Sequence, residues 1–143
     1  MFVRYRAKNW IVFLPLFRGM SGGGILPVSR IEPIPVTLVT EPGRLLALDA
    51  DTALLRLPAN SGHGHEDGGQ CIACAMRTDV RALLFDMLEG AKQGLRPIFS
   101  KVVVDASAVK DVAVVIAALT GKLPAQALRD HTVARSFYLA GAA

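Results

Sequence analysis

Two cysteines separated by two residues are the side chains of this sequence best suited to chemistry. Cys71 and Cys74 have a spacing at which both thiolates can bind one Zn²⁺, at Zn–S distances of about 2.3 Å. A closed zinc site usually has four ligands, and the candidates in the polar stretch just before the cysteines are His63, His65, Glu66 and Asp67. The sequence therefore predicts a site for zinc or a related soft divalent metal, formed by the two cysteines with His63 and His65.

Two other interpretations fit the same residues. A C-x-x-C pair that opens a helix favours the reactive thiolate form, which suits a redox function. The cysteines can also be buried without chemistry, because loops rich in Gly, His and acidic residues such as Glu66 and Asp67 are common solvated turns. Two cysteines do not make a disulfide framework, so we expect a reducing compartment, the cytoplasm.

Composition places the chain among globular proteins. Its 143 residues are 52% hydrophobic and 20% charged, which suits one domain with a real core. The net charge of +4 would allow nucleic-acid binding, but the basic residues are scattered, and Arg4, Arg6 and Lys8 at the N-terminus hold a large share. Without a basic stripe and interleaved aromatic residues, we expect no nucleic-acid partner.

The first 33 residues differ from the rest of the sequence. The apolar run Trp10–Phe17 is too short for a membrane span of about 20 residues, contains Pro15 and is followed by Arg18 without an A-x-A cleavage site. The glycine tract that follows does not favour regular structure. We therefore expect an unstructured or extraneous leader over 1–33, and a folded region over 34–143.

Strand and helix patterns alternate from residue 34 onward. The apolar runs predict strands at 35–40, 45–49 and 99–105 and another that begins at 137; helical spacing predicts a helix capped by Thr78 that extends to Ala91, and helices at 110–119 and 125–134. This order is typical of an α/β protein with a parallel sheet and flanking helices. Ligands bind such sheets at the carboxyl ends of the strands, where Thr40, Asp49 and Asp105 are expected.

The run Gly69–Val80 resembles the N-G-C-I-C-C-x-x-R-x-D-L signature of the CobW-type GTP-binding metallochaperone family. The run Lys101–Asp111 partly resembles the strand and E-T-T-G-x-A-D-P segment that follow in this family, and the resemblance extends over about residues 33–141. It implies a fragment of a P-loop-type parallel sheet, with residues 34–143 as a partial CobW-like nucleotide-binding domain. It also implies that Asp105 would hold a Mg²⁺-bound water, with Ser107 and Asp49 as further cofactor-binding residues.

The sequence departs from the family where phosphate chemistry is expected. The family's opening strand runs into a G-x-x-x-x-G-K-S/T loop that cradles phosphates, whereas Thr40 is followed by Glu41-Pro42-Gly43-Arg44. The guanine-reading N-K-x-D segment is also missing, and Ala73 replaces the family's middle cysteine. Because phosphoryl transfer depends on the missing groups, GTP and Mg²⁺ are doubtful cofactors and this chain is not expected to hydrolyse GTP by itself.

Three hypotheses about function follow. The first is a CobW-like protein of GTP binding and metal homeostasis that has lost hydrolysis, with a metalloprotein client. The second is a non-enzymatic zinc-binding module, and the third a truncated remnant without stable function. A first strand that lacks its crossover helix leaves one face of the sheet uncovered, so a partner chain is also expected.

Overall fold

A four-stranded parallel sheet forms the centre of the protein. The computed structural model describes residues 32–44, 47–61 and 77–143. Its elements, in chain order, are β1 (Ile34–Val39), β2 (Thr52–Arg56), α2 (Val80–Lys92), β3 (Lys101–Asp105), α3 (Val112–Leu119), α4 (Leu128–Ser136) and β4 (Phe137–Ala142). The strand order is β2-β3-β1-β4, and every neighbouring pair is parallel. The prediction of an α/β fold with a parallel sheet and flanking helices is thus confirmed.

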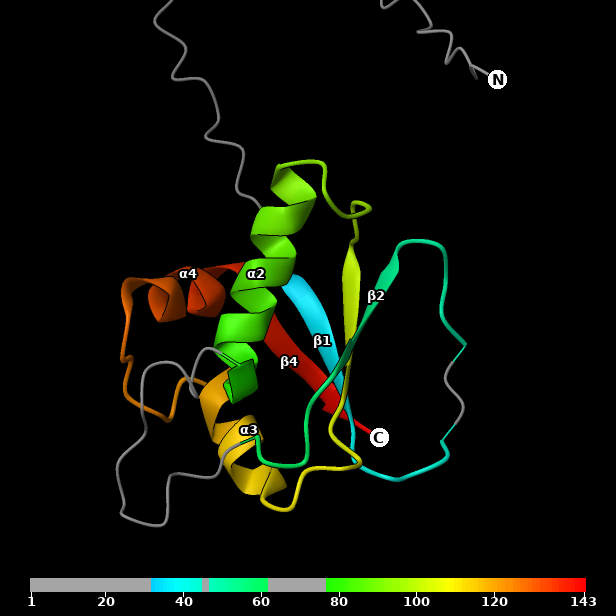
Figure 1. The fold of residues 1–143 in the computed structure, drawn as a ribbon, viewed down its shortest axis with the longest axis vertical. Helices are drawn as coiled ribbons and strands as arrows, with labels where there is room; N and C mark the ends of the chain where they lie inside the picture. The colour runs from blue at the N-terminus through cyan, green and yellow to red at the C-terminus, as the bar shows by residue number, and fades with distance from the viewer. Residues whose placement is uncertain (1–31, 45–46, 62–76) are drawn as a thin grey trace, which may run out of the picture.

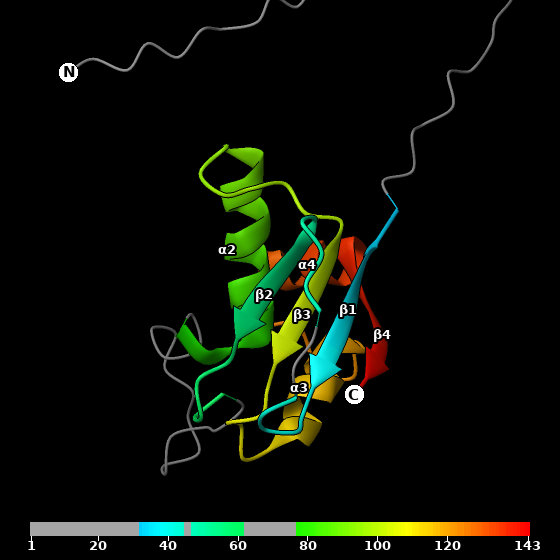
Figure 2. The same cartoon turned by 90° about the vertical axis from the view of Figure 1, so that its right-hand side faces the viewer.

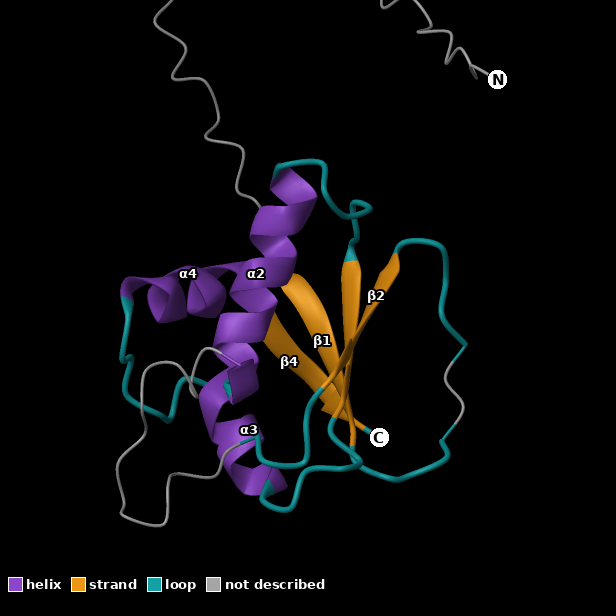
Figure 3. Cartoon of the chain, in the orientation of Figure 1, coloured by secondary structure: helices purple, strands orange, loops and turns teal. Residues whose placement is uncertain are grey.

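The three helices lie on one face of the sheet (Figures 1 and 3). The steps from β2 to β3 and from β3 to β4 run in the same direction across the sheet, so right-handed crossovers place their helices on the same face. The step from β1 to β2 runs in the opposite direction, and its connection passes along the other face (Figures 1 and 2). The described residues of that connection, 40–44 and 47–51, form no helix.

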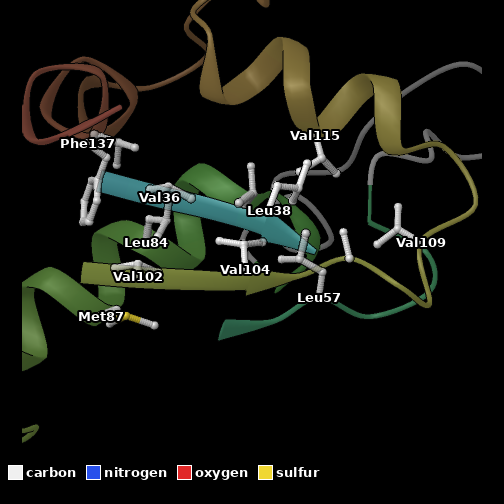
Figure 4. Close-up of a cluster of buried hydrophobic side chains, with 13 residues drawn as sticks. Val36, Leu38, Leu57, Leu84, Met87, Val102, Val104, Val109, Val115 and Phe137 are labelled. Carbon is white, nitrogen blue, oxygen red and sulfur yellow. The ribbon is translucent and has the colours of Figure 1, made fainter. Parts of the chain in front are cut away.

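The core lies between the sheet and the helices (Figure 4). Val36 and Leu38 of β1 stand beside Val102 and Val104 of β3 in the parallel register, and all four are almost completely buried. Because side chains alternate along a strand, this set points to one face, where it packs against Leu84 and other side chains of the core cluster. The near-continuous apolar runs of β1 and β3 are what the centre of a parallel sheet requires.

Helix α2 begins with a buried polar network. Asp79 caps the helix, since its side chain accepts a hydrogen bond from the Arg81 backbone N–H at 2.8 Å. The Arg81 guanidinium lies 2.9 Å from Asp79 and 3.6 Å from Asp130, and it donates to the Pro124 carbonyl at 3.1 Å. The network therefore ties the start of α2 to the segment between α3 and α4. The prediction of Thr78 as the cap was wrong, because Asp79 has the extended backbone and the acceptor that a cap needs.

The second strand is the main difference from the sequence prediction. The expected strand at 45–49 was wrong in its described part, because residues 47–49 are not a strand and β2 lies at 52–56. The Thr52 N–H donates to the Asp49 carbonyl at 3.0 Å, so a turn separates the two runs. Pairing with β3 decides between them: it places Ala53 beside Val102 and Leu55 beside Val104, where both contribute to the core.

Leu38 tests the core. Its side chain is fully buried, so replacement by Ala should lower the free energy of unfolding by about 2–5 kcal/mol, from lost burial and the cavity left behind. Urea unfolding followed by circular dichroism measures the change. Leu128→Ala is the control, since Leu128 is 87% exposed and its loss should cost less than about 0.5 kcal/mol. Equal effects of the two substitutions would contradict the assigned core.

Arg81 tests the buried network. Arg81→Ala leaves Asp79 and Asp130 without their main counter-charge, which should cost about 3 kcal/mol of unfolding free energy. Arg129 still faces Asp130 at 3.8 Å, so the loss should stay at the lower end of the range for broken buried pairs. The matched control is Arg135→Ala, because Arg135 is exposed and its Nε donates to the His131 carbonyl within α4. An unchanged urea midpoint for Arg81→Ala would refute a stabilising role of the network.

Candidate functional site

The carboxyl ends of β1 and β3 lie side by side, and from there the chain continues in opposite directions across the sheet, from β1 to β2 and from β3 to β4. The connection after β1 leaves over one face and the connection after β3 over the other, which is where open α/β sheets bind ligands. Val39 pairs with Asp105 at this point, and the Ala106 N–H donates to the Val39 carbonyl at 2.8 Å. A cavity of about 160 Å³ opens beside them on the face away from the helices, with Glu41, Arg44, Arg56, Asp105 and Ser107 as its charged and hydroxyl-bearing lining.

Asp105 is the most constrained acidic group of this cavity. Its Oδ1 accepts hydrogen bonds from the Ser107 hydroxyl at 2.6 Å and from the Ser107 N–H at 3.0 Å. Its Oδ2 lies 3.8 Å from Nε of Arg56. Hydrogen bonds from the Ser107 hydroxyl and then from the Ser107 N–H hold the pKa of Asp105 below its ordinary value. Burial opposes them, and the charge of Arg56 contributes the smallest effect, which also lowers the pKa. The carboxylate is therefore ionised and already used in closing the turn after β3.

The predicted cofactor-binding residues separate into two places. Asp105 and Ser107 are in direct contact at the carboxyl edge. Thr40 also lies at this edge, where its N–H donates to the carbonyl of Ala143 at 3.1 Å. Asp49 does not: its carboxylate lies 3.3 Å from Nζ of Lys101, the first residue of β3, at the opposite end of the sheet. Its expected position at the carboxyl edge was wrong because the strand that follows it begins only at Thr52.

The segment after β1 has a different form from a phosphate loop. Residues 41–43 make a turn in which Gly43 has φ of +77°, a conformation that glycine adopts without strain. Arg44 and Glu41 lie 3.7 Å apart, both largely exposed. An acidic side chain therefore closely follows β1 at the carboxyl edge of the sheet.

The predicted metal ligands Cys71, Cys74, His63 and His65 lie in residues 62–76, outside the described residues. Among the residues that are described, no group of three or more His, Cys, Asp and Glu side chains could hold a metal ion. The flanks of 62–76 are placed: the Leu57 N–H donates to the Asp105 carbonyl at 2.9 Å, and α2 begins at the same end of the sheet (Figure 1). The metal site stays a prediction for a segment that starts and ends near the carboxyl edge.

Arg56 is a site residue that the sequence prediction missed. It is the last residue of β2, and the parallel register places it opposite Asp105. A strand predicted at 52–56 would have identified it, because parallel strands bring their carboxyl ends to one edge. Arg56 was missed because the second strand was predicted at 45–49 instead.

Comparisons with known proteins add no assignment. No family model, curated protein or solved structure shows significant similarity to the chain. In the described part of the chain, none of the helices has the length and apolar character needed to cross a membrane. The resemblance to CobW-type proteins thus rests on the motifs of the sequence.

Asp105 gives a pH-dependent test. Because its pKa is lowered in the folded protein, its stabilising contribution is fully present above its unfolded pKa of about 3.9 and is lost as the pH falls through the folded value. Asp105→Asn should therefore lower unfolding free energy at pH 7 by about 1 kcal/mol, and the difference from the unmodified protein should shrink below about pH 4. Urea unfolding over a pH series measures this difference. Asp111→Asn is the control, since Asp111 is exposed and its side chain makes no cap hydrogen bond; a similar pH-dependent loss there would contradict the assignment.

Proposed function

We propose that this protein is a metal-handling derivative of a CobW-type GTP-binding domain that does not hydrolyse GTP. The observation that carries the proposal concerns the carboxyl ends of β1 and β3. The carboxylate of Asp105 there accepts a hydrogen bond from Ser107 and lies near Arg56, beside a cavity of about 160 Å³. Pockets for drug-sized ligands measure about 300–1,000 Å³, so this cavity is small for a nucleotide.

The charges at the end of β1 support the same conclusion. Phosphoryl transfer depends on amides, a lysine and a bound Mg²⁺ that stabilise negative charge. Glu41 instead brings a negative charge to this position, where its carboxylate lies 3.7 Å from the guanidinium of Arg44. Together with the missing G-K-S/T sequence, this arrangement argues against turnover of GTP.

Metal handling is the part of the family's function for which the chain keeps candidate residues. Cys71, Cys74, His63 and His65 supply the sulfur and nitrogen ligands that zinc prefers. Both ends of the segment that holds them are anchored at the carboxyl edge, by the bond from Leu57 to Asp105 and by the start of α2. A metal bound there would be presented at one end of the sheet to a client metalloprotein in the cytoplasm.

Calorimetry with two ligands tests the proposal. Zn²⁺ should bind with a stoichiometry of one, and GTP with Mg²⁺ should give no heat of binding and no release of phosphate. The double variant Cys71→Ser/Cys74→Ser should lose zinc affinity by at least tenfold, and His63→Ser/His65→Ser should weaken it. His131→Ser is the matched control, because this third histidine of the chain lies in α4.

The outcomes separate the remaining hypotheses. Tight GTP binding would overturn the loss of nucleotide function. Zinc affinity unchanged in the double cysteine variant would overturn metal handling. If neither ligand binds and thermal unfolding is not cooperative, a remnant without stable function becomes the better description.

A further inference from the structure

The face of the sheet away from the helices is covered only in part. Alternation along the strands directs Thr37 of β1, Leu54 of β2, Val103 of β3 and Tyr138 of β4 to this face, opposite to the core residues. Val103 is only 8% exposed, and it lines one cavity together with Arg44 and Leu48 of the connection from β1 to β2, which runs along this face (Figure 2). Leu54 and Tyr138 remain 40% and 49% exposed.

This incomplete cover is unusual for the architecture. All-parallel sheets occur almost only where both faces are covered, because their strands are apolar on both sides. The connection from β1 to β2, which must pass over this face, contributes Leu48, and Leu48 is itself 45% exposed. Leu54 and Tyr138 lie on the two edge strands of the sheet, β2 and β4, and these two side chains together with Leu48 are here called the open face.

We propose that the N-terminal segment Trp10–Phe17 of the same chain binds the open face. All eight residues of this segment, W-I-V-F-L-P-L-F, are apolar. The segment lies outside the described residues, and the chain that follows it enters the sheet at Ile34, the first residue of the central strand β1. This inference does not depend on the proposed function.

The length of the connecting chain permits this contact. Residues 18–33 can span about 50 Å when extended, and a six-residue strand is about 20 Å long, so every point of the open face is within reach. A short tether of this kind gives an effective concentration in the millimolar range. A second copy of the chain would have to compete with a cover that is already attached.

Trp10 makes the proposal directly measurable, because it is the only tryptophan of the chain. Fluorescence excited at 295 nm therefore reports on this segment alone. In the 143-residue chain we expect an emission maximum shifted to the blue, and an acrylamide quenching constant at least twofold lower, relative to a synthetic peptide of residues 1–33. Neither value should change when the protein is diluted tenfold.

Substitutions on the open face locate the contact. Leu54→Glu/Tyr138→Glu should move the Trp10 emission and quenching to the values of the free peptide. Leu128→Glu, at a residue 87% exposed in α4 on the helical side of the sheet, should leave both unchanged. If the double variant does not fold, Ile11→Glu/Phe13→Glu in the segment itself gives the same test, with increased binding of a hydrophobic dye to the open face as the expected result.

Each other outcome contradicts the proposal. Peptide-like fluorescence in the unmodified protein would show that the segment stays in solvent. A blue shift lost on dilution would assign the open face to a second copy. A blue shift that appears only with vesicles of anionic phospholipid would assign the segment to a membrane surface, and an unchanged signal in Leu54→Glu/Tyr138→Glu would place it elsewhere on the protein.

Discussion

The parallel pairing of β1 with β3 is the interaction on which the rest of the structure depends. One register sets Val36 beside Val102 and Leu38 beside Val104, which builds the core against α2. The same register ends by setting Val39 beside Asp105, which builds the candidate site. A slip of one residue would reverse the faces of β1, so core and site would be lost together. The hydrophobic core and the candidate site are therefore positioned by the same backbone hydrogen bonds.

The order of the strands explains why the two faces of the sheet differ. Two of the three crossovers step one way and share a face, which receives all three helices of the described chain. The single crossover in the other direction is short, and most of the asymmetry of the molecule follows from it. It places the reversal of chain direction at the carboxyl ends of β1 and β3, and it leaves apolar strand residues exposed on the face away from the helices. The candidate site and the open face thus have a common cause in the chain path.

The sequence predicted those elements whose pattern is determined locally or by strong burial. Apolar runs identified β1, β3 and the start of β4, and helical spacing identified α2. The strand β2 was missed because the runs before and after Asp49 have similar residue types, and only pairing with β3 selects the second. That error carried over to the site: Asp49 was placed at the wrong end of the sheet, and Arg56 was not recognised.

The buried network of Arg81 was also beyond reach of the sequence. Asp130 lies far along the chain from Arg81, and within the apolar pattern of α2 an arginine looks like an ordinary surface residue. By contrast, the contact between Asp105 and Ser107 is local, since an Asp side chain commonly accepts from the backbone two residues on, although the sequence analysis named the two residues only as candidates for cofactor binding.

The position of β4 in the sheet has a consequence for how the protein forms. Ile34 at the start of β1 pairs with Phe137 at the start of β4, so the contacts of a central strand join distant parts of the chain. Chains dominated by such non-local pairs fold slowly, because loop closure must precede the gain from the contacts. During synthesis, β1 has one side unpaired until residues 137–142 have left the ribosome. An apolar strand with a free edge is prone to pair with other chains, so β1 is most open to aggregation before β4 is in place.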